Sequence, residues 1–240
     1  MNRRRFAVAL AVAPAVPSLA TRVAAQDSDP DIAEMQETVE AMQTEVAAAG
    51  YDSIPEADEL SQSRFDRKLA NATEAEPAFG PSKGSLAHDE QYIALEFSSG
   101  YYANFVLSAR FTNPIEDADE TFDFGVEFRI SGDYVTPSRI YLIFSGNGSW
   151  YASVGTDEEW SAEKELNLGS GEASSFDDSV DGVNELTLIV EDQQAHFAIN
   201  GEYVASIGLP PAVVGAVAIG TGFYTGDAVD GRVTRFREFT

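Results

Sequence analysis

The sequence predicts a mainly β protein, an antiparallel two-sheet sandwich that follows an N-terminal helical appendage. From about residue 85 onward, apolar and polar residues alternate in short segments, and clusters of Gly, Asp and Asn separate these segments. Alternation with period two places one face of each strand in a core, and its regular repetition is typical of sandwiches. Between residues 27 and 50, in contrast, apolar residues recur every three or four positions, as on one face of a helix.

The first 25 residues have the layout of an export signal, with a basic start, an Ala/Val-rich middle and a small-residue end. The apolar stretch is interrupted by Pro14 and Pro17 and falls short of the ~20 residues that span a bilayer, so we expect no membrane span in the mature chain. Residues 2–6, Asn-Arg-Arg-Arg-Phe, also resemble a twin-arginine signal, and the twin-arginine and general routes remain equal alternatives. We therefore expect an exported protein, extracellular or in the cell envelope.

The charge balance limits the classes of molecule that this chain can bind. Lys and Arg total 15 against 40 Asp and Glu, a formal net charge of -25, and such a field repels phosphate backbones. We therefore expect no nucleic-acid partner and read most acids as solvated surface. Cysteine is absent, so an exported chain of this kind must fold on core burial alone or with bound ions.

Residues 26–84 are expected to form an acidic helical appendage and linker. Asp29 suits an N-cap, Pro30 the first helical position and Gly50 the C-cap. One face of this helix carries an apolar stripe that comprises Ile32, Met35, Val39, Met42 and Val46. This stripe either packs on the sandwich or on a second helix, or it forms the contact surface of a homo-oligomer through residues 30–49. Leu60, Phe65 and Leu69 mark the second helix.

Residues 85–240 are expected to form the sandwich. In FDFGVEFRI, the apolar face carries Phe122, Phe124, Val126, Phe128 and Ile130, and the other face carries Asp123, Gly125, Glu127 and Arg129. In ANFVLSARFT, the apolar face carries Phe105, Leu107, Ala109 and Phe111.

The segment AHFAINGEYVASI predicts a hairpin. Asn200-Gly201 suits a two-residue type I′ turn, because both central residues need positive φ. This turn pairs Ile199 with Glu202, Ala198 with Tyr203 and Phe197 with Val204, and it places His196, Ala198 and Tyr203 together on the face away from the core. That second face is expected to be either solvated surface or the floor of a groove.

The order of these segments resembles the concanavalin A-like lectin/glucanase superfamily, and its laminin-G-like and keto-disaccharide-hydrolase-like domains most of all. The resemblance covers roughly residues 85–239 and depends on the NG-x-x-V hairpin, the Gly-bearing strand VVGAVAIGTG and the closing VTRFREF. It implies a jelly roll of two antiparallel sheets, one of them concave, that often binds glycans on that face or at its rim.

The resemblance favours an exported non-catalytic carbohydrate-binding or cell-surface interaction module, with a glycan or cell-surface polysaccharide as partner. The laminarinase-like catalytic branch carries Glu-x-Asp-x-x-Glu along one strand, and this chain lacks that motif. Residues 116–120, EDADE, have the wrong spacing and read as a solvated loop. The alternatives are a glycoside-acting hydrolase of the lectin/glucanase fold with its acids on loops, or a self-assembling structural surface protein.

Carbohydrate-binding sites bind sugars through amphipathic aromatic rings and a few oriented polar groups. Trp160 follows three acids in an apparent loop and is the first choice for an exposed platform. The other candidate ligand-binding residues are Trp150, Tyr151, Arg110, Glu127, Arg129, His196 and Tyr203. Of these, Arg110, Glu127 and Arg129 are expected on the face of neighbouring strands that points away from the core, where His196 and Tyr203 could join them. The competing interpretation is that the aromatic residues belong to the core and that Arg and Glu form cross-strand pairs on a solvated face.

DDSVDG at 177–182 resembles the start of a calcium loop. Asp177, Ser179 and Asp181 offer oxygens at alternating positions and Gly182 permits a sharp turn, so Ca²⁺ is a candidate cofactor. The twelfth loop position is Leu188 and no helix flanks the segment, so the match is partial. His88 and His196 are the only histidines, and no nucleophile or zinc motif accompanies them.

Overall fold

The computed structural model describes residues 54–74, 76–89, 92–117, 119–130, 138–156, 166–211, 214–224 and 229–240. The export-signal segment and the 30–49 helix lie outside these ranges, so the contact surface of a homo-oligomer stays a prediction.

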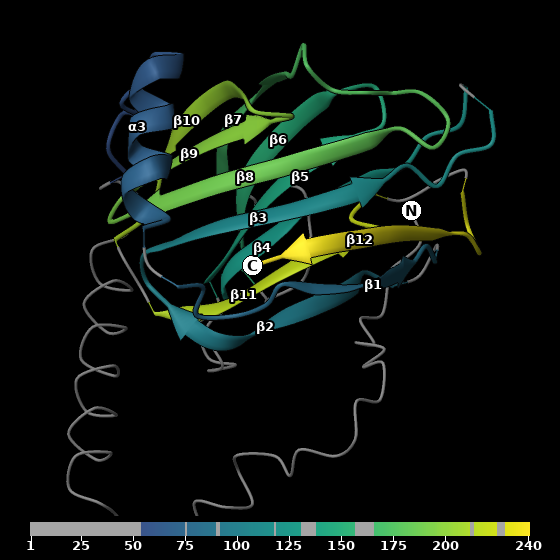
Figure 1. The fold of residues 1–240 in the computed structure, drawn as a ribbon, viewed down its shortest axis with the longest axis horizontal. Coiled ribbons are helices and arrows are strands. Elements are labelled where there is room, and N and C mark those ends of the chain that lie inside the picture. The colour runs from purple at the N-terminus through teal and green to yellow at the C-terminus, as the bar shows by residue number, and fades with distance from the viewer. Residues whose placement is uncertain are drawn as a thin grey trace, which may run out of the picture.

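Twelve strands of the described residues form two six-stranded antiparallel sheets, as the sequence predicted (Figure 1). Sheet A has the order β1-β12-β3-β8-β9-β10 and sheet B the order β2-β11-β4-β5-β6-β7. The strands of sheet A are β1 Ser82–Ala87, β3 Phe105–Thr112, β8 Val183–Glu191, β9 Gln194–Ile199, β10 Glu202–Gly208 and β12 Val233–Phe239. Those of sheet B are β2 Ala94–Tyr102, β4 Asp123–Ile130, β5 Ser138–Ser145, β6 Ser149–Thr156, β7 Leu166–Glu172 and β11 Gly215–Thr221.

The two sheets pack face to face through a core rich in phenylalanine. Phe111 of β3 and Phe124 of β4 stack across the sheets with ring centroids 4.3 Å apart, and neither ring is exposed. Phe124 also stacks on Phe144 and Phe176, each at 5.9 Å. The alternation along β3 and most of β4 therefore predicted the buried face correctly.

Two strands have no clear alternation in the sequence. β1 (SKGSLA) starts at Ser82, three residues before the boundary expected at 85, and β7 (LNLGSGE) carries two glycines and few apolar residues. Both are edge strands. An edge strand contributes few side chains to the core, so its apolar pattern is weak.

The helix α3, Gln62–Ala72, lies on the outer face of sheet A over β8, β9 and β10 (Figure 1). Phe65, which is 1% exposed, packs with Leu60 against Ile189 and Ala198. The second helix expected around Leu60, Phe65 and Leu69 is therefore present, and all three residues face the sheet. We call residues 54–72 the strap.

Polar contacts fasten the strap along β9 and β10. Gln62 donates from Nε2 to the Gly201 carbonyl at 2.9 Å, and its Oε1 accepts from the Tyr203 amide at 2.7 Å. The Asp58 amide donates to Gln194 Oε1 at 2.9 Å. The bond to Tyr203 occupies a backbone amide of the edge strand β10, and unpaired backbone groups of an edge strand offer a template for another strand.

The β9–β10 hairpin has the predicted turn, with φ of 52° at Asn200 and 80° at Gly201. Glu202 pairs with Ile199 and Tyr203 with Ala198, but an irregularity after Tyr203 places Ala205, not Val204, opposite Phe197. The strap covers the face that carries His196, Ala198 and Tyr203. That face is neither solvated surface nor the floor of a groove, because the apolar side of the amphipathic helix α3 packs on it.

A chain of hydrogen bonds lies beneath the strap. His196 Nδ1 is 2.6 Å from Ser206 Oγ, which is 2.7 Å from the Tyr203 hydroxyl, and that hydroxyl donates to Glu59 at 2.8 Å. Burial lowers the pKa of His196, and the nearby charge of Lys68 acts in the same direction. His196 is therefore buried in its neutral form.

The depressed pKa of His196 predicts an acid-sensitive fold. Below pH about 6.5 the unfolded chain binds a proton at this residue while the folded chain does not, so the free energy of unfolding falls as the pH drops. We expect the urea midpoint to fall between pH 7.5 and 5.5, and to fall less in His196→Gln, whose side chain does not titrate. Equal pH dependence in the two proteins would contradict this assignment.

Candidate functional site

The outer face of sheet B, the face turned away from the core, carries exposed aromatic rings at the strand β2. Phe97 is 41% exposed and Tyr101 is 65% exposed. Phe97 pairs with Ala218 and Tyr101 with Ala216 on β11. Because residues directly opposite each other share a face, both rings lie on the outer face beside two small side chains.

An ion pair occupies the middle of this face. Arg139 of β5 contacts Glu127 of β4 through Nη1 and Oε1 at 3.1 Å. The Glu127 side chain is 1% exposed and that of Arg139 is 25% exposed. Tyr141 lies opposite Glu127 in the β4–β5 pairing and is also buried. Arg139 is therefore the more accessible member of the pair.

The end of the face near Asp123 is closed by apolar side chains. Phe223, which follows β11, meets Tyr141 edge-on at 6.0 Å, and Ile143, Ile93 and Leu95 complete this cluster. Asp123 accepts the backbone amides of Gly222 at 2.6 Å and Tyr224 at 2.8 Å, which holds the Phe223 turn against the sheet. Among the described residues, the open part of the face is consequently the half at the Phe97–Tyr101 end of β2.

The structure places two of the predicted ligand-binding residues on this face, Glu127 and Tyr151. Tyr151 pairs with Ile143 and is partly buried. Trp150 instead points into the core, where it is 8% exposed and meets Phe197 edge-on at 4.9 Å. Trp160 lies outside the described residues, so its role as a platform stays a prediction.

Arg110, His196 and Tyr203 lie on the other sheet. Arg110 and Glu127 were expected on the same face of neighbouring strands, but β3 belongs to sheet A and β4 to sheet B. Arg110 pairs with Glu185 at 2.9 Å and Glu238 at 3.1 Å on neighbouring strands. It thus forms the solvated cross-strand pairs of the competing interpretation, and the expected cluster of these residues with Glu127 does not form.

Arg129 was expected beside Glu127, and that expectation is wrong. The β4–β11 register shifts at this point, so that Ala216 pairs with Ile130 and Val217 with Phe128, which leaves Arg129 as the extra residue of a bulge with φ of 54°. A bulge of one residue moves the following side chain to the opposite face. Ile130, expected in the core, therefore shares the outer face with Ala216.

The Arg129 side chain is 1% exposed. It donates to the carbonyl of Pro210 at 2.9 Å and also to that of Asp192, which joins β8 to β9. Burial lowers the pKa of Arg129 to about 10, against the opposing influence of Asp192, so the residue stays charged at neutral pH. It therefore ties sheet B to loops of sheet A and is not available to a ligand.

The predicted calcium loop is held by hydrogen bonds within the protein. Asp177 Oδ1 accepts from the Ser179 amide at 3.1 Å and its hydroxyl at 2.5 Å, and these bonds lower the pKa of Asp177. In the described ranges no three His, Cys, Asp or Glu side chains gather closely enough to hold a metal ion. A Ca²⁺ ion bound by Asp177, Ser179 and Asp181 stays a prediction.

The tip of the β9–β10 hairpin contacts this same loop. Asn200 donates to the Ser175 carbonyl at 2.7 Å and to Asn184 Oδ1 at 3.1 Å, and it accepts from the Glu185 amide at 2.8 Å. All these partners belong to the 175–185 segment. Asn200 of the turn thus fixes the tip of the β9–β10 hairpin to the 175–185 segment.

Sequence reasoning did not select Phe97 or Arg139 as site residues. In RIYLIF, Arg139 shares one face with Tyr141 and Ile143, and the apolar residues Ile140, Leu142 and Phe144 share the other. This alternation indicates that Arg139 points away from the core, and it could have identified Arg139 as a site residue. Nothing in QYIALEF distinguishes Phe97 as exposed, because it reads as one more apolar strand residue.

No protein-family model matches the chain, and no curated protein matches it in sequence. Among solved structures, it is similar to a fructosyltransferase from A. japonicus with a TM-score of 0.51 and 16% identity, over 72% of this chain and 27% of that one. The carbohydrate binding module CBM66 from Bacillus subtilis aligns with a TM-score of 0.46 and 10% identity, over 68% of this chain and 96% of that one.

Identities this low establish a shared fold only. The chain has the concanavalin A-like lectin/glucanase fold, a jelly roll of two antiparallel sheets, as the resemblance in its sequence implied.

Proposed function

We propose that the chain is an exported, non-catalytic carbohydrate-binding module that binds a polysaccharide across the β2 half of the outer face of sheet B. The observation that carries this proposal is the exposure of Phe97 and Tyr101 on that face. Exposed rings of this kind stack on the apolar faces of sugar rings. Of the two rings, Tyr101 also offers a hydroxyl that can bond to a sugar hydroxyl.

The geometry suits an extended ligand. Phe97 and Tyr101 pair with Ala218 and Ala216, which are two residues apart on β11 because β2 has an irregularity between the two rings, so the rings lie about 7 Å apart along the strand direction. The side chains next to them on β11 are Ala216 and Ala218, which leave both rings raised above the sheet. Two raised rings along one line present a track for a chain of sugars, and the Arg139–Glu127 pair lies further along the same face.

The carboxylates on this face support binding without hydrolysis. Asp123 and Glu127 share the outer face of β4, but four residues of strand place them about 13 Å apart. Glycosidases hold their two carboxyl groups about 5 to 9.5 Å apart. Asp123 is occupied by two backbone amides and Glu127 by Arg139, so neither is placed for acid-base work on a sugar.

The proposal that the chain is exported is based on the layout of residues 1–25 and on the acidic composition. Within the described ranges, no helix has the length and apolarity needed to cross a bilayer. The carbohydrate ligand of an exported module would be a polysaccharide outside the cell or in its envelope.

Tyr101→Ala is expected to weaken binding to the preferred polysaccharide about tenfold, because stacking on an aromatic ring contributes about 0.5–1.5 kcal/mol beyond the burial of its area. A glycan array identifies the ligand, and affinity electrophoresis in that polysaccharide measures the loss. Tyr224→Ala is the matched control: Tyr224 is 40% exposed and lies beyond the opposite end of β11. Absence of binding to every glycan, or equal losses in both variants, would overturn the proposal.

A further inference from the structure

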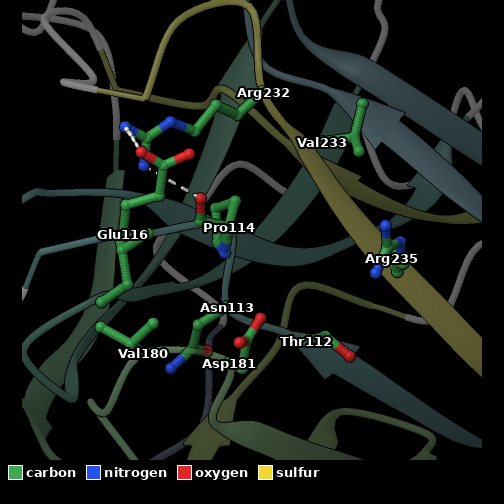
Figure 2. Close-up of a pocket in the computed structure, with 10 residues that line it drawn as sticks. Thr112, Asn113, Pro114, Glu116, Val180, Asp181, Arg232, Val233 and Arg235 are labelled. Carbon is green, nitrogen blue, oxygen red and sulfur yellow. Dashed lines mark hydrogen bonds and ion pairs between the residues drawn. The ribbon is translucent and has the colours of Figure 1, made fainter.

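A cavity of about 320 Å³ opens at one end of sheet A, where β3 ends and β8 and β12 begin (Figure 2). Figure 2 shows Arg235, Thr112 and Asp181 on one side of this space and Arg232 with Glu116 on the other. Pro114, Val180 and Val233 supply apolar surface. This cavity lies on the sheet opposite to the β2 face, and none of its residues belongs to that face.

The loop that carries Asp181 is held rigidly from behind. Asn113 donates from Nδ2 to the carbonyls of Asp177 and Ser179, both at 2.8 Å, and its amide donates to the Gly182 carbonyl at 2.9 Å. Asn113 in turn accepts from Asn184, which is fully buried. Asp181 itself has a φ of 57°, which the surrounding bonds maintain.

The opposite wall is held by a bidentate ion pair. Arg232 contacts Glu120 through two nitrogens, at 2.6 and 2.7 Å, and reaches the Pro114 carbonyl at 3.3 Å. The hydrogen bond from Arg232 lowers the pKa of Glu120 to about 2, so the pair persists through neutral and mildly acidic pH. Arg232 therefore shapes the cavity, and the cavity is formed before any ligand arrives.

Arg235 and Asp181 are the charged lining groups that remain available. Neither makes a side-chain hydrogen bond or an ion pair with another described residue, and they do not pair with each other. Arg235 offers only donors and ionised Asp181 only acceptors, while the Thr112 hydroxyl offers both. A ligand that spans them must therefore accept at one end and donate at the other.

We propose that this cavity binds a single sugar ring through its hydroxyl groups, with Asp181 accepting and Arg235 donating. A hydroxyl both donates and accepts, and ring C–H groups suit Pro114, Val180 and Val233. The lining holds two basic and two acidic side chains, so it favours neither a cationic nor an anionic ligand. The net negative charge of the whole chain also disfavours anions. The volume, at the low end of small-molecule sites, fits one ring better than a chain.

The test is titration of the full chain with the methyl glycosides of glucose, galactose, mannose, xylose and fructose, followed by ligand-observed NMR. We expect at least one glycoside to bind, and Asp181→Asn and Arg235→Gln to weaken that binding about tenfold each, as for loss of a charged hydrogen bond. Asparagine tolerates the same positive φ as aspartate, so the fold should persist. Val180→Trp puts a bulky ring into the cavity while it keeps both charged residues in the chain, and it should abolish binding.

This proposal does not depend on the β2 face, and Tyr101→Ala is expected to bind the glycosides like the unmodified chain. Failure of all five glycosides to bind would overturn it, as would binding that Asp181→Asn and Arg235→Gln leave unchanged. Competition by glycine betaine or inorganic sulfate at lower concentrations than any glycoside would also overturn it, in favour of a zwitterion or an anion. Loss of polysaccharide binding in Tyr101→Ala alone concerns the β2 face and leaves this cavity intact.

Discussion

Phe124→Ala is expected to lower the free energy of unfolding by about 3–5 kcal/mol, the range for phenylalanine truncated inside a core. The Phe124 ring has no exposed surface and stacks on Phe111, Phe144 and Phe176. These partners come from both sheets and from the loop before β8, so they cannot all move to fill the space. The substitution therefore loses both transfer free energy and packing around a cavity.

Urea unfolding followed by fluorescence measures this effect. Phe97→Ala is the matched control, because it removes the same atoms from a ring that is 41% exposed on the outer face of sheet B. We expect its cost to stay below about 1 kcal/mol. A cost for Phe124→Ala as small as that of the control would show that the two sheets do not meet at Phe124.

Asn184→Ala is expected to cost about 2–4 kcal/mol and to loosen the 175–182 loop. Asn184 is fully buried, and its side-chain amide makes four hydrogen bonds, two as acceptor and two as donor. Its Oδ1 accepts from the Asp177 amide at 2.8 Å and from Asn200 at 3.1 Å, and its Nδ2 donates to Asn113 at 3.1 Å and to the Asp177 carbonyl at 2.9 Å. Truncation removes the partner of the Asp177 amide and of Asn113 Oδ1, and each polar group left unpaired costs about 1–3 kcal/mol before relaxation.

Unfolding in urea and limited proteolysis around residue 179 together measure this outcome. Asn167→Ala is the matched control, since Asn167 is exposed and its side chain accepts one bond, from the Gly169 amide at 2.8 Å. Its cost should be less than about 1 kcal/mol. If the two asparagine variants unfold and are cleaved alike, the loop does not depend on Asn184.

The phenylalanine alternation explains why the fold was predictable. Phe105, Leu107, Ala109 and Phe111 on β3, Phe124, Val126 and Phe128 on β4, and Phe122 just before β4 all face the core, as the period of two required. The Asn200-Gly201 turn was predictable for a local reason as well, because positive φ at two successive residues favours this pair.

The candidate site was less predictable, and Arg110, Glu127 and Arg129 show why. Period two assigns side chains to the two faces of one strand, but it does not say which strand lies alongside. Consecutive strands β3 and β4 lie in different sheets, which separates Arg110 from Glu127. The bulge at Arg129 arises from pairing with β11, which lies some ninety residues further along the chain.

The sequence by itself determined the alternation that builds two apolar faces, the Asn-Gly turn and the apolar side of the α3 helix. These features depend on neighbours within a few residues, where backbone geometry and burial act directly. Only the tertiary structure decided that the strap covers His196 and Tyr203, that Phe97 and Tyr101 stay uncovered, and that Asp181 and Arg235 line one cavity. Those outcomes depend on which distant segments pack together, and packing is set by the whole chain.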